Sequence, residues 1–201
     1  LEELALNSKY HLAQIHALWT LEGLEKLDEN VLFTLLDNLG AYHPKVIIHV
    51  LRLTEQLAKE NNHVKKRLEK FYLKNQETIS NEELALQMIL TAGSLSEEGS
   101  KTTIASILKN NIDEPIFRDG ALSSLYNYEY SFLLYLIKQN QWKEHSPSKA
   151  IFLEMVATAI SRKNNEREML KLLNLLEQRN LAKDWQAYSI FTGMSMAGAQ
   201  K

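Results

Sequence analysis

Apolar residues recur along the chain with the spacing of amphipathic helices. Leu32, Leu35, Leu36 and Leu39 fall at i, i+3, i+4 and i+7, and the same spacing returns between residues 169 and 176. Residues spaced in this way lie on one face of a helix. No window alternates apolar and polar residues with a period of two for long enough to indicate a sheet. The pattern therefore predicts an all-α protein.

Residues that cap or break helices divide this pattern at regular intervals. Helix starts are predicted at six places, 33 to 38 residues apart: Ser8, His43-Pro44, Ser80-Asn81, Asp113-Glu114-Pro115, Ser146-Pro147 and Asp184. A second break divides each of the five intervals: Asp28-Glu29-Asn30, Asn61-Asn62, Ser96-Glu97-Glu98, Tyr128-Glu129 and Asn164-Asn165-Glu166. Each interval is therefore expected to form a helical hairpin of about 35 residues.

Repeats of this length are typical of α-solenoids, in which each hairpin buries its apolar face on its neighbours. The sequence predicts a single right-handed α-solenoid domain over residues 1–201, HEAT-like or armadillo-type, with about five hairpins and a terminal helix. The hairpins are expected at 8–42, 43–79, 80–112, 113–145 and 146–182, and the last helix at 184–196. An irregular helical domain with accidental spacing is the alternative.

Composition agrees with this assignment and excludes several classes of protein and site. Seven Gly and three Pro are too few for the turns of a sandwich or barrel. With 45% hydrophobic residues and a net charge of -2, the chain can bury a core and is not disordered. The absence of Cys excludes disulfides, thiolate metal sites, Cys nucleophiles and covalent haem attachment. No apolar run approaches the ~18 residues of a membrane span.

One segment carries a family resemblance. Residues 13–24 read Ala-Gln-Ile-His-Ala-Leu-Trp-Thr-Leu-Glu-Gly-Leu. This segment resembles the HEAT-like repeat region of bacterial multidomain, membrane-bound dehydrogenase-type proteins, and departs from that pattern only at Gln14 and Ile15. Weaker similarities follow in the same order at residues 43–55, 87–95 and 118–125. In that family a propeller similar to quinone-dependent sugar dehydrogenases is followed by helical repeats and a haem-binding cytochrome c module.

The resemblance implies a scaffold rather than a catalyst. The family's catalytic, quinone-binding and haem-ligating residues belong to the other modules, so no catalytic, cofactor-binding or metal-binding residue is expected here. The chain would position the propeller relative to the cytochrome c module, in the periplasm or cell envelope, with those flanking modules as partners. Because the first residue is Leu1, we expect a region of a longer or processed protein. A stand-alone scaffold for a protein or nucleic acid remains the alternative, and a free enzyme is the third hypothesis.

The histidines do not have the spacing of a metal site. His11 and His16 are five residues apart, and His43 and His49 are six apart, so the members of each pair diverge around a helix. The chain also lacks the metalloprotease, phosphate-loop, dinucleotide-binding and nucleophile-elbow motifs. Sequence alone therefore identifies no candidate catalytic or metal site.

The segment that carries the resemblance is itself expected to be structural. Trp19 is predicted to be a buried residue that stabilises the fold, because its large side chain lies on an apolar helix with no polar residues converging on it. His16 is predicted to be a hydrogen-bonded structural histidine. The pairs Glu82-Glu83 and Glu97-Glu98 suit the first turns of helices, where the helix dipole favours acidic side chains.

Two groups of side chains in the middle of the chain are candidate surfaces. A basic cluster comprises Lys65, Lys66, Arg67, Lys70 and Lys74. Because Glu60 and Glu69 interrupt it, we expect a solvated helix face rather than a nucleic-acid interface. An aromatic group comprises Tyr126, Tyr128, Tyr130, Phe132, Tyr135 and Trp142. It is either the core and turn of the fourth hairpin or a contact patch, since Tyr and Trp are enriched at interface hot spots.

The last helix is the remaining candidate surface. Its apolar residues, which include Trp185, Phe191 and Met194, span several faces. A helix of this kind expects contacts on more than one side. We therefore predict that it packs on the fifth hairpin and leaves an apolar strip on its outer side, for a following module or a second copy. Together with Tyr126, Tyr128 and Tyr130, these three residues form the predicted interaction surface.

Overall fold

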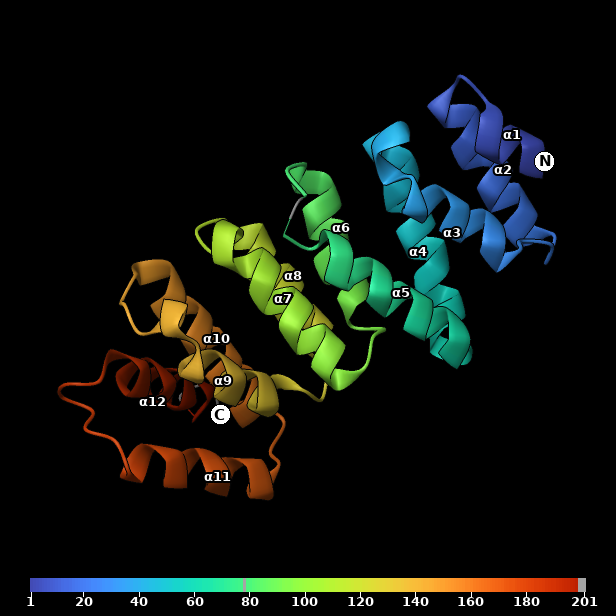
Figure 1. The fold of residues 1–201 in the computed structure, drawn as a ribbon. Helices are drawn as coiled ribbons and strands as arrows, with labels where there is room; N and C mark the ends of the chain where they lie inside the picture. Colours follow the sequence, from blue (N-terminus) through green and yellow to red (C-terminus); the bar gives the residue numbers. More distant parts are fainter. Residues whose placement is uncertain (78, 199–201) are drawn as a thin grey trace. The chain divides into compact units, whose positions relative to one another are not determined.

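The computed structural model describes residues 1–77 and 79–198, which form helices joined by turns (Figure 1). The first helices are α1 (Glu2–Asn7), α2 (His11–Gly23), α3 (Glu29–Asp37), η1 (Leu39–Ala41), α4 (Pro44–Glu60), α5 (Asn62–Asn75), α6 (Glu82–Ala92) and α7 (Glu97–Asn111). They are followed by α8 (Pro115–Ser124), α9 (Glu129–Lys138), η2 (Asn140–Trp142), α10 (Pro147–Arg162), α11 (Glu166–Glu177) and α12 (Trp185–Gly198). No strand occurs in the two described ranges, so the all-α prediction is confirmed.

The chain divides into two compact units, Leu1–Ile107 and Leu108–Lys201, and the boundary falls inside α7. In the first unit, α4 packs against α2, α3, α5 and α6, and therefore forms the centre of its core. Val46 and Ile47 on this helix are fully buried. In the second unit, α10 packs against α8, α9, α11 and α12. The prediction of one continuous array over 1–201 stays a prediction.

The predicted helix starts are confirmed where a cap or a proline defines them. Pro44, Pro115 and Pro147 each occupy the first turn of their helix. Side chains of these N-cap residues accept hydrogen bonds from backbone N–H groups of the turn that follows: Asp28, His43, Asn61, Asn81, Ser146 and Asn165. Such caps satisfy donors that have no partner within the helix.

Two differences from the prediction concern the ends of the chain. The first hairpin was expected to begin at Ser8, but α2 begins at His11, and an unpredicted helix, α1, precedes it. The side chain of Gln14 ties these two helices together, because its amide donates to the carbonyl of Ala5 over 3.1 Å. At the other end, α12 continues to Gly198, two residues beyond the predicted end.

The fifth hairpin packs differently from the expected α10–α11 pair. The most extensive contact of α10 is with α12 rather than with α11. Gly193 makes this contact possible, because a Cβ atom there would lie 2.3 Å from the carbonyl oxygen of Glu154 and 2.9 Å from the Cβ of Ala157. The hydroxyl of Thr158 also donates to the Gly193 carbonyl over 2.9 Å. Helix α11, in contrast, buries only Leu172 and Leu176.

Candidate interaction surfaces

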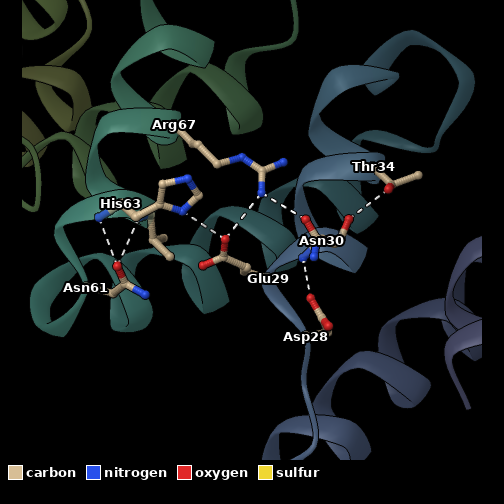
Figure 2. A network of polar contacts seen from close by, with 8 residues as sticks. Asp28, Glu29, Asn30, Thr34, Asn61, His63 and Arg67 are labelled. Carbon is tan, nitrogen blue, oxygen red and sulfur yellow. Dashed lines mark hydrogen bonds and ion pairs between the residues drawn. The ribbon is translucent and has the colours of Figure 1, made fainter.

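A network of polar side chains joins α3 to α5 in the first unit (Figure 2). Glu29 Oε1 lies 3.0 Å from His63 Nδ1 and 3.4 Å from Arg67 Nη1. Arg67 also donates to Asn30 Oδ1 over 3.1 Å, and its guanidinium carbon lies 3.9 Å from the centre of the Phe33 ring. Arg67 therefore forms part of the contact between α3 and α5.

The rest of the predicted basic cluster behaves as expected for a solvated face. Lys66, Lys70 and Lys74 are exposed, and Lys65 is half-buried. No ion pair joins these four lysines to another described residue. Arg67 is the exception, since it belongs to the network of Figure 2.

Trp19 does not occupy the buried, wholly apolar site that the sequence predicted. Its side chain is half-buried, and its indole N–H donates to Nδ1 of His49 over 3.0 Å. The prediction for His16 is also wrong, because this side chain is exposed one turn before Trp19. Sequence reasoning missed the pair because Trp19 and His49 are 30 residues apart and belong to different helices, α2 and α4.

The surroundings of His49 alter its titration. Burial, and secondly the positive charge of Arg52, lower the pKa of His49. Because Nδ1 accepts the indole proton of Trp19, a neutral ring must carry its own proton on Nε2. A neutral His49 thus has one donor left for another group.

A second histidine contact was also outside the reach of the sequence analysis. The rings of His11 and His43 stack with 4.3 Å between their centres and an interplanar angle of 13°. The two residues come from the start of α2 and the cap of α4. Comparing histidines within one helix could not reveal this contact. Among the described residues, no group of three or more His, Asp or Glu is placed to hold a metal ion.

The three candidate tyrosines of the second unit lie around the start of α9. Tyr126 is 73% exposed, and the Lys163 ammonium lies 4.9 Å from the centre of its ring. Tyr128 and Tyr130 are half-buried. Burial, and secondly the charge of Glu168, raise the pKa of Tyr130. Of these three predicted residues, only Tyr126 is largely exposed.

Lys163 has a second role beneath Tyr126. Its ammonium pairs with the Glu129 carboxylate at 2.6 Å, and the Glu129 side chain is only 7% exposed. Nearby, Phe132 and Trp142 are buried against Phe152, as expected if these members of the aromatic group are core residues. The aromatic group is therefore partly core and partly surface.

The three candidate residues on α12 also differ in how exposed they are. Phe191 is 48% exposed, whereas Trp185 and Met194 are half-buried. The indole of Trp185 donates to the carbonyl of Lys143 over 3.0 Å, and Met194 lines a hollow of about 300 Å³ with Met169. Tyr188, one turn before Phe191, is 59% exposed and was not among the predicted residues. The exposed large apolar residues of α12 are therefore Tyr188, Phe191 and Met196.

Exposed large apolar side chains gather on four helices. Of sixteen in the described residues, five lie on or beside α1 and α2 and six on or beside α11 and α12. The members of the first set are Leu1, Leu4, Tyr10, Leu12 and Leu24. The members of the second set are Leu170, Leu173, Leu181, Tyr188, Phe191 and Met196. We call them the α1–α2 surface and the α11–α12 surface.

Comparisons with known proteins leave the family open. No family model matches the sequence, and searches of curated proteins and of solved structures gave no significant match. The resemblance of residues 13–24 to a dehydrogenase-associated repeat region therefore stays a prediction. Within the described ranges, none of the helices combines the length and the apolar character needed to cross a bilayer.

Proposed function

We propose that the chain is a non-catalytic, HEAT-like α-solenoid that holds other protein modules through its first two and last two helices. The repeat is supported by three side-chain pairs between helices that lie 34 or 35 residues apart. Glu29 and His63 are 34 residues apart, Arg52 and Gln87 are 35 apart, and Glu129 and Lys163 are 34 apart. In a solenoid of 35-residue units, equivalent positions of successive units meet in this way.

The observation that carries the docking role is the concentration of exposed apolar side chains. The α1–α2 and α11–α12 surfaces occupy less than a third of the described chain but hold eleven of its sixteen exposed large apolar residues. Exposed apolar residues that gather on one part of a surface are typical of sites that bind another protein. Tyr188 and Phe191 are aromatic residues of the kind that dominates such contacts.

The resemblance supplies the proposed context. In a dehydrogenase-type protein, the two surfaces would contact a propeller and a cytochrome c module in the cell envelope. A scaffold with two docking surfaces suits that role, because electron transfer requires a fixed distance between donor and acceptor modules. No step of the chemistry is assigned to this chain.

The experiment begins with the reading frame that encodes the chain. A propeller and a Cys-x-x-Cys-His module in the same reading frame are expected. Each module is then produced separately, and its binding to the chain is measured by isothermal titration calorimetry. The double variant Tyr188→Glu, Phe191→Glu should weaken the binding of one module at least about tenfold, because charges replace its apolar contacts.

Leu73→Glu is the matched control. Leu73 is 70% exposed on α5, outside both surfaces, so this variant should bind as the wild type does. A reading frame without other modules would contradict the proposal. Equal binding by the wild type and the double variant, for both modules, would also contradict it.

A further inference from the structure

A groove between α4 and α6 in the first unit has the character of a binding site. It encloses about 290 Å³, and each helix contributes residues at i, i+3, i+4 and i+7. Helix α4 contributes Lys45, Ile48, His49 and Arg52, and helix α6 contributes Glu83, Leu86, Gln87 and Leu90. The groove lies outside the α1–α2 and α11–α12 surfaces, so it is independent of the docking role proposed above.

A chain of hydrogen bonds holds Arg52 in place. Its Nε donates to Gln87 Oε1 over 2.8 Å, and the Gln87 amide donates to the Thr91 hydroxyl over 3.1 Å. Thr91 in turn donates to the Glu55 carboxylate over 3.3 Å. Arg52 is exposed, but Gln87 and Thr91 are buried, so the group that accepts from its Nε is held in place by the core.

The way in which Arg52 is held leaves its terminal nitrogens for a ligand. Only Nε is used by Gln87, and Nη1 and Nη2 have no partner among the described residues. Planar guanidinium donors match the two oxygens of a carboxylate. Because the side chain is already oriented, a ligand loses less conformational entropy by binding to it.

His49 supplies a second oriented donor one turn away. The Trp19 indole fixes the ring through Nδ1 at 3.0 Å, which leaves the Nε2 proton of the neutral ring for a ligand. Lys45, a further turn along α4, adds an exposed positive charge. The α4 wall of the groove therefore carries two positive charges and one neutral donor.

The opposite wall has a different chemistry. Leu86 is half-buried and Leu90 is 40% exposed, so α6 offers apolar surface next to the donors of α4. Glu83 is exposed at the edge of the groove and repels further negative charge there. This arrangement favours a ligand with one carboxylate and one large apolar group over a ligand with several negative charges.

We propose that this groove binds a segment of a partner protein in which an acidic side chain is next to a large aliphatic residue. The carboxylate pairs with Arg52 and accepts from His49 Nε2. The aliphatic side chain packs on Leu86 and Leu90. A short peptide with this chemistry is acetyl-Glu-Leu-amide, whose blocked ends leave the side chain as its only carboxylate.

The test is an NMR titration of the ¹⁵N-labelled chain with this dipeptide and with acetyl-Gln-Leu-amide. The Trp19 indole N–H signal should shift in a saturable manner with the Glu peptide, because its acceptor, His49, contacts the bound carboxylate. The indole signals of Trp142 and Trp185 should not move. The Gln peptide should bind at least about fivefold more weakly, because it lacks the charge.

Variants separate this site from general attraction to a basic surface. Arg52→Met should weaken binding of the Glu peptide about tenfold. Gln87→Leu should weaken it severalfold while Lys45 and Arg52 remain, because Arg52 then loses its orientation. Lys66→Met removes a positive charge from exposed surface on α5 and should leave binding unchanged.

Three results would overturn the proposal. The first is the absence of a saturable shift of the Trp19 signal with the Glu peptide. The second is equal binding of the Glu and Gln peptides. The third is an equal loss of binding in Arg52→Met and Lys66→Met, with both variants folded as judged by circular dichroism.

Discussion

Within each unit, side-chain pairs join neighbouring helices. The pairs of the two units have similar sequence separations but different chemistry. In the first unit, Glu29 meets His63 and Arg67 in a half-exposed network, and Arg67 covers Phe33. In the second unit, Glu129 is nearly buried beneath Lys163, and α12 approaches α10 so closely that only a glycine fits at position 193. Regular spacing therefore does not imply equal sensitivity to substitution.

The reason for the difference is solvation. Water screens half-exposed ion pairs, which therefore contribute little to stability. A buried carboxylate that loses its cation remains without water, and its cost is several times larger. The second unit is therefore expected to be more sensitive to substitution at its interhelical contacts than the first.

Gly193→Ala should cause the largest loss of stability among these variants. The added methyl group would overlap the backbone of α10 at Glu154, which cannot move as a flexible side chain can. We expect the free energy of unfolding to fall by about 3 kcal/mol, at the upper end of overpacking effects. Thermal unfolding followed by circular dichroism measures it. Gly198→Ala, where an added Cβ has no atom within 4 Å, is the control, and equal effects of the two variants would contradict the packing of α12.

Lys163→Met should cause the next largest loss in the free energy of unfolding. It removes the partner of a Glu129 side chain that is 7% exposed, so the carboxylate is left unpaired, and we expect a loss of about 3 kcal/mol in chemical unfolding. The double variant Lys163→Met, Glu129→Leu removes the charge as well and should recover most of the loss. If the single variant were as stable as the wild type, the pair would not be buried in solution.

Arg67→Met should cost much less, about 0.5–1 kcal/mol. Glu29 is 25% exposed in its side chain and keeps its contact with His63, and methionine can still cover the Phe33 ring. The same unfolding measurement gives the comparison with Lys163→Met. A larger loss for Arg67→Met than for Lys163→Met would mean that the first unit is the more sensitive to substitution at its interhelical contacts.

The smallest expected effect is a dependence on pH. Because the pKa of His49 is lowered in the fold, the neutral ring contributes stability that is fully present above its ordinary pKa of about 6.5. This contribution is lost as the pH falls through the lowered value. His49→Gln keeps an acceptor for Trp19 but does not titrate. Between about pH 7.5 and about pH 5.5, the melting temperature of the wild type should fall further than that of the variant, by on the order of 1 °C. Equal changes in the melting temperatures of the wild type and the variant would contradict the lowered pKa of His49.

Local signals in the sequence were sufficient to predict most helix starts. Pro44, Asn81 and Pro147 act within one turn, so their effect does not depend on the rest of the fold. The short helix α1 was missed because no cap or breaker precedes it. These signals lie within a few residues of each start, which is why the sequence suffices there.

Contacts between helices were harder to predict, because they depend on how one helix is rotated against the next. Trp19 and His49 could be paired only once α2 and α4 were placed. Gly193 did leave a signal, since a glycine inside an apolar helix often marks a close approach. The apolar pattern of that helix did not show which residues face the fifth hairpin, and Met194, predicted on the interaction surface, lies beside Met169.

Hydroxyl-radical footprinting of the intact polypeptide would test the docking role most directly. The modification rates of Tyr10, Tyr188 and Phe191 are compared between the isolated chain and the full product of its reading frame. Tyr126, which is 73% exposed outside both docking surfaces, serves as the internal reference. The proposed scaffold predicts that Tyr188 and Phe191, and Tyr10 with the other module, become protected while Tyr126 keeps its rate. Unchanged rates at Tyr10, Tyr188 and Phe191 in the intact polypeptide would contradict it.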